Sequence, residues 1–92
     1  KLDQPAVLAA LAVLQAFQTT ELAREVKISE IAARHRNDIR MYCDELPFEI
    51  RWGRGAFDTQ ARRLDALWKH KNKQLDFHSY CDLRWGADIA CM

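Results

Sequence analysis

The sequence has few helix-breaking residues and none of the common catalytic signatures. Three glycines and two prolines occur among 92 residues, which favours helices over a β fold rich in turns. Glycine-rich phosphate-binding loops and the G-x-S-x-G nucleophile elbow are absent. The adjacent acids Asp44 and Glu45 would point in different directions on a helix, so they would not act on one bond. The sequence therefore predicts a protein that is not an enzyme.

Charge is missing from the whole stretch between Gln4 and Thr20. The stretch is shorter than the roughly 20 apolar residues that a membrane span needs, so no transmembrane segment is predicted. A helix that is apolar on every side must be covered on every side, and so short a chain has little left to cover it. We therefore expect a homodimer or a complex with another protein. The expected interface residues are Val7, Leu8, Leu11, Leu14 and Phe17.

Cysteines are few and odd in number: Cys43, Cys81 and Cys91. Small secreted scaffolds usually carry an even set, so free thiols in a reducing cytoplasm are expected. One disulfide with a leftover thiol is the alternative. His70 and His78 could join Cys81 and Cys91 around zinc, but their spacing matches no compact zinc motif. No metal and no cofactor are predicted.

Apolar periodicity predicts an all-α fold, a small bundle of four to five helices with one short extended segment around 48–52. The helices are expected over 4–18, over 29–46, from Asp58 onward and from Asp76 to Gly86. Residues 48–52 alternate between large apolar and charged side chains, which is the period of a strand. We expect one helical domain, 1–92. Because the chain opens at Lys1 rather than methionine, it is expected to be a fragment or a trimmed chain.

The net charge of +1 hides a basic middle between two acidic flanks. Residues 51–73 hold seven lysines and arginines against two aspartates, whereas the segments on either side are each net negative. Cations beside an aromatic side chain can neutralise phosphates and stack on bases. The possible polyanion-binding residues are Arg51, Trp52, Arg54, Arg62, Arg63, Lys69 and Lys73. Internal pairing with the acidic flanks is the alternative explanation.

The sequence leaves three function classes open. The first is a cytoplasmic, non-enzymatic protein–protein interaction or regulatory module that associates through its apolar N-terminal helix. The second is a nucleic-acid-binding protein that uses residues 51–73; Thr20–His35 also resembles a helix-turn-helix, a second route to DNA. The third is a membrane-active protein that uses the N-terminal run together with the basic helix. We expect the first.

Overall fold

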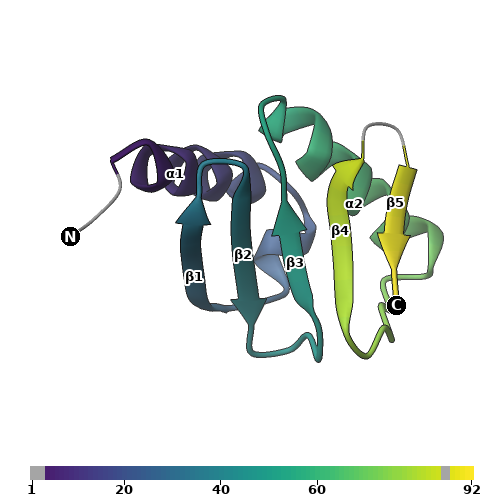
Figure 1. Cartoon of the computed structure of the whole chain (residues 1–92). Coiled ribbons are helices and arrows are strands. Elements are labelled where there is room, and N and C mark those ends of the chain that lie inside the picture. The colour runs from purple at the N-terminus through teal and green to yellow at the C-terminus, as the bar shows by residue number, and fades with distance from the viewer. Residues whose placement is uncertain (1–3, 86–87) are drawn as a thin grey trace.

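The chain folds as two helices packed on one face of a mixed β-sheet (Figure 1). The computed structural model describes residues 4–85 and 88–92. Within them the sheet has five strands in the order β1-β2-β3-β4-β5. The elements are α1 (Gln4–Gln18), the short 3₁₀ helix η1 (Leu22–Arg24), β1 (Ile28–His35), β2 (Asp38–Cys43), β3 (Glu49–Trp52), α2 (Phe57–His70), β4 (Tyr80–Trp85) and β5 (Asp88–Cys91).

The prediction of an all-α bundle is wrong, since the chain is an α/β fold. The expected helix over 29–46 is the antiparallel hairpin of β1 and β2, with His35 paired to Asp38 across a two-residue turn. In β2 every second side chain is buried, as in Ile39, Met41 and Cys43. A two-residue period and a 3.6-residue period agree at several positions of so short a stretch, and the turn contains no glycine to mark it.

Other expected elements have mixed outcomes. The helix over 4–18 is confirmed as α1, and the extended segment around 48–52 is confirmed as β3. The helix expected from Asp58 is α2, but Ala56 holds the N-cap position and Asp58 lies in the first turn. The helix expected from Asp76 is wrong, because the chain forms β4 there. Its expected end, Gly86, lies outside the described residues.

The sheet is mixed because α2 returns the chain between β3 and β4. These two strands pair in parallel, with Ile50 opposite Cys81, whereas the other neighbouring strands pair antiparallel. A parallel pair needs such a crossover, since a tight turn joins only antiparallel strands. No helix among the described residues is long and apolar enough to cross a lipid bilayer.

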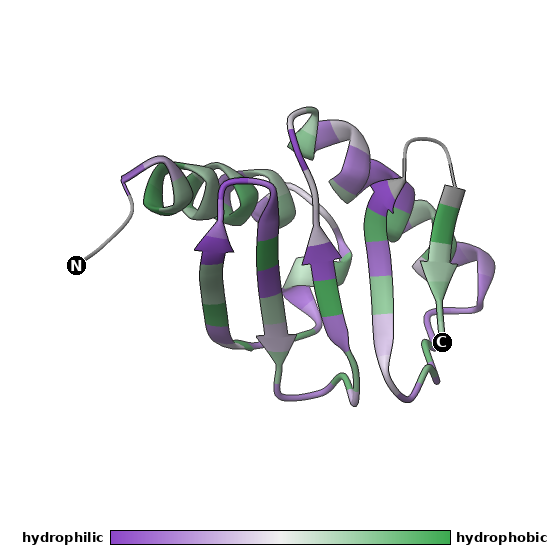
Figure 2. Cartoon of the chain, in the orientation of Figure 1, coloured by the Kyte–Doolittle hydropathy of each residue, from purple (hydrophilic) through white to green (hydrophobic). Residues whose placement is uncertain are grey.

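The core lies between the sheet and the two helices. Alternating hydrophobic and hydrophilic residues along β2 and β3 are visible as colour bands in Figure 2. Trp52 and Phe17 are both fully buried, and their rings meet edge to face with centroids 6.1 Å apart. Such an aromatic pair adds to the burial of its large apolar area. It ties α1 to the centre of the sheet.

Two polar side chains of α2 fix the loops beside it. Asp65 accepts the backbone N–H of Leu22, which starts η1, at 3.0 Å. The buried side chain of Gln60 accepts the N–H of Gly53 and donates to the carbonyls of Gly53 and Gly55. Buried polar groups need such partners. These bonds hold α2 against both loops.

Candidate interaction surfaces

The outer face of α1 carries two large apolar side chains in solvent. Leu8 is 64% exposed and Leu11 is 52% exposed. Residues three apart lie on the same side of a helix, so the two leucines form one patch. The neighbouring side chains Gln4, Gln15 and Gln18 are exposed and uncharged. We call Leu8, Leu11 and these glutamines the α1 outer face.

The structure separates the five residues that were expected to form an interface. Leu8 and Leu11 lie on the surface, Val7 and Leu14 are half-buried, and Phe17 is in the core. The expectation that α1 must be covered on every side is therefore too strong, because the sheet covers one side only. Phe17 supports the fold, and the remaining apolar surface is narrower than the sequence predicted.

The residues expected to bind a polyanion do not form one surface. Trp52 lies in the core, and the guanidinium of Arg51 stacks over the ring of Tyr80 at 4.1 Å on the sheet face that no helix covers. Lys69 forms ion pairs with Glu21 and Asp65, which raise its pKa. The ion pair of Lys69 with Glu21 is internal pairing with an acidic flank, which stood as the alternative for the basic stretch.

The other basic residues lie near α2. Arg62 is exposed and donates to Thr59. Arg54 and Arg63 do come together, because both line a hollow of about 220 Å³ that Arg84 also borders. Lys73 lies in a separate place, at the other end of α2. The stretch is therefore divided among several separate locations and does not form one basic strip.

Glu49 is the centre of a polar network on the helix-free face of the sheet. Its carboxylate accepts from Arg40 at 3.0 Å, from Arg51 and from the hydroxyl of Tyr42 at 3.1 Å. Burial raises the pKa of Glu49, but these hydrogen bonds and the charge of Arg40 outweigh it, so the pKa lies below its usual value. Asp38 also pairs with Arg40. The network satisfies these charges internally, and the sequence analysis missed it.

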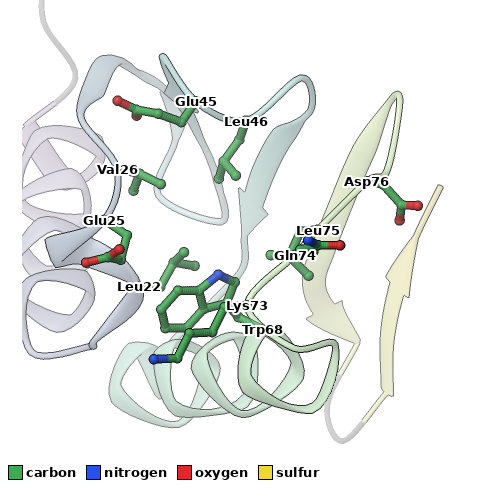
Figure 3. A pocket seen from close by; sticks show the side chains of 10 residues that line it. All are labelled: Leu22, Glu25, Val26, Glu45, Leu46, Trp68, Lys73, Gln74, Leu75 and Asp76. Carbon is green, nitrogen blue, oxygen red and sulfur yellow. The ribbon is translucent and has the colours of Figure 1, made fainter.

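A groove opens between η1, the loop after β2 and the chain that follows α2 (Figure 3). Its volume is about 490 Å³. Five of its lining residues are apolar: Leu22, Val26, Leu46, Trp68 and Leu75. The other five are polar or charged: Glu25, Glu45, Lys73, Gln74 and Asp76. We call this the α2 groove. It joins segments far apart in sequence, so periodicity alone gave no sign of it.

The cysteines take the form that the sequence analysis held as its alternative. Cys81 and Cys91 are joined in a disulfide between β4 and β5, and Cys43 is a buried free thiol. Burial raises the pKa of Cys43 to about 11, with a smaller contribution from Glu45. The disulfide also removes both thiolates from the alternative zinc site. The cytoplasmic location was predicted from three free thiols, whereas disulfides persist in oxidising compartments. It therefore stays a prediction without that support.

Comparison with protein families identifies a match over most of the chain. The model of the family described as "Cell division protein FtsQ/DivIB, C-terminal" matches residues 2–84. This span includes both helices and the first three strands completely, and it reaches almost to the end of β4. No curated protein matches the chain.

Proposed function

Because the chain belongs to the family of C-terminal domains of the cell division proteins FtsQ and DivIB, we propose that it is a non-enzymatic module that binds another protein of the division machinery through the α1 outer face. The observation that carries this proposal is the solvent exposure of Leu8 and Leu11 on a helix with no charged residue. Apolar side chains that gather on a surface mark sites of protein association.

The free energy gained by burying Leu8 and Leu11 is enough to stabilise one part of a protein–protein interface. Burying a leucine side chain stabilises a complex by about 1.5–3 kcal/mol before ordering costs. The flanking glutamines can form hydrogen bonds with a partner and bring no charge that must be neutralised. A second copy of the chain is the other possible occupant, and the test below separates the two.

Replacement of Leu11 tests the proposal in the whole protein. We expect Leu11→Asp to reduce co-purification of other division proteins by about tenfold or more, because a carboxylate would be buried without a partner. The fold should survive, since Leu11 is exposed. The measurement is quantitative mass spectrometry of proteins cross-linked to and purified with the tagged protein from its own cells.

Ala66→Asp provides the matched control, because it adds the same charge to an exposed helix position outside the α1 outer face and removes no large apolar side chain. It should retain most of the association. Equal losses in both variants would point to charge rather than apolar contact. Unchanged association in Leu11→Asp would contradict the proposal, and loss of only self-association would assign the face to a homodimer.

A further inference from the structure

The floor of the α2 groove is apolar and formed by the core itself. Leu22 and Trp68 are buried, whereas Val26, Leu46 and Leu75 are half-buried along the groove. Three segments supply these side chains: the chain around η1, the loop after β2 and the chain around the end of α2. The floor therefore has the size and chemistry to receive an apolar side chain.

The rim of the groove is acidic. Glu25, Glu45 and Asp76 are exposed and come from three different segments around the opening (Figure 3). Lys73 is the one cationic residue that lines the groove within the described part of the chain. Glu45 accepts the backbone N–H of Lys27 at 2.7 Å, which fixes its carboxylate. Glu25 and Asp76 form no ion pair with any described residue. The rim thus has an excess of negative charge.

The backbone at the end of α2 holds one wall of the groove in place. Lys73 donates its N–H to the carbonyl of Trp68, and Asn72 donates to Lys69, the two bonds of a Schellman motif. Asn72 and Lys73 both have positive φ, 57° and 63°. This turn lays the Lys73 ammonium over the indole of Trp68, 5.7 Å from its centroid. A cation is therefore already accommodated on this floor.

We propose that the α2 groove binds a short basic segment of a partner protein, with an apolar side chain of that segment on the floor and its lysines or arginines beside Glu25, Glu45 and Asp76. Charge complementarity selects this occupant, since an acidic rim attracts cationic side chains and repels nucleic acid and anionic lipid. The site is separate from the α1 outer face, so it adds a second surface to the proposed function and does not rest on the first.

Peptide titration tests the charge complementarity. The probe is the synthetic peptide acetyl-Lys-Lys-Leu-Leu-Lys-Lys-amide, and the readout is isothermal titration calorimetry at low and at raised salt. We expect the double variant Glu25→Gln, Asp76→Asn to bind it about tenfold more weakly than the original protein. Binding by the original protein should weaken as salt is raised, because the attraction is between exposed charges.

The matched control is the double variant Glu30→Gln, Asp58→Asn, which removes the same charge from exposed sites outside the groove. It should bind the peptide like the original protein. Equal weakening in both double variants would overturn the proposal, because it would mean attraction to overall charge. No binding, or tighter binding of the peptide with glutamate in place of lysine, would overturn it as well.

Photo-cross-linking in cells tests the occupant. A photo-reactive residue in place of Gln74, which is exposed and lines the groove, should form an adduct with a protein segment that combines basic and apolar residues. The same residue in place of Gln18 probes the α1 outer face. Adducts at position 74 without adducts at position 18 would support the groove and contradict the first surface. No adduct at position 74, or adducts only with lipid or nucleic acid, would overturn the groove proposal.

Discussion

Single residues in the left-handed conformation shape both ends of α2. Ala56, at its N-cap position, has φ 43° and makes no side-chain capping bond. Asn72 and Lys73 hold the same region of conformational space at the other end. Residues other than glycine reach this region at a cost of about 1–2 kcal/mol each. Within the described residues the chain retains this cost at three positions, and one of them, Lys73, lines the α2 groove.

Replacing Ala56 should make the protein more stable. We expect Ala56→Gly to raise the free energy of unfolding by about 0.5–1 kcal/mol, because glycine adopts the left-handed conformation without steric strain. The greater conformational freedom of glycine in the unfolded chain offsets part of this gain. Urea unfolding followed by circular dichroism measures the change. The control is Ala66→Gly, also exposed but inside α2, which should lower stability by about 1 kcal/mol. A loss in both variants would contradict the prediction.

At the scale of elements, β3 positions the residue that organises the helix-free face. Its alternation places Ile50 and Trp52 in the core and Glu49 and Arg51 on the other side. Glu49 then lies beside arginines from two strands, Arg40 and Arg51. A sheet face without a helix over it would otherwise leave half-buried charges unpaired.

The pH dependence of the free energy of unfolding on the acid side should reveal the contribution of this network. We expect Glu49→Gln to lower the free energy of unfolding by about 1–2 kcal/mol at neutral pH. Because the folded-state pKa of Glu49 is lowered, its contribution is present above the unfolded pKa and is lost as pH falls through the folded pKa. The stability difference between variant and original should therefore shrink in acid, as urea unfolding over a pH series would show. Glu30→Gln, at an exposed site on β1, should change stability little at any pH.

The elements that the sequence predicted correctly are those with one dominant signal. An unbroken uncharged run predicted α1, and strict alternation predicted the segment of β3. The hairpin of β1 and β2 was predicted as a helix because its turn, Arg36 and Asn37, lacks glycine or proline and its apolar residues fit both periods. Of the expected interface residues, Leu8 and Leu11 are on the surface, whereas Phe17 is buried by a sheet that the sequence analysis did not expect.

At the scale of the whole molecule, the disulfide between Cys81 and Cys91 fastens the last strand to the sheet. It closes a short loop, with a sequence separation of 10 residues. β5 is an edge strand paired to β4 alone. An edge strand is hydrogen-bonded on one side only, so a covalent link here limits its separation from the sheet.

Thiol counting and unfolding should both detect this link. Without reductant, iodoacetamide should label no cysteine in the folded protein near neutral pH, because Cys43 is buried and its pKa is raised to about 11. In denaturant without reductant it should label only Cys43. With reductant and denaturant it should label all three. The double variant Cys81→Ser, Cys91→Ser should be less stable by about 2–4 kcal/mol. Reductant should destabilise the original protein and leave that double variant unaffected; three labelled thiols without reductant would contradict the link.

The parallel pairing of β3 with β4 sets an order of folding. The antiparallel pairs β1–β2, β2–β3 and β4–β5 join strands that are close in sequence, and such contacts close first because their loops are short. β4 reaches β3 only after α2 has turned the chain back. On the ribosome, residues 28–52 are complete before β4 exists, so β3 is for a time the open edge of a half-built sheet. During that interval the open edge of β3 can pair with a strand of another nascent chain, which would occupy the hydrogen bonds that β4 later forms.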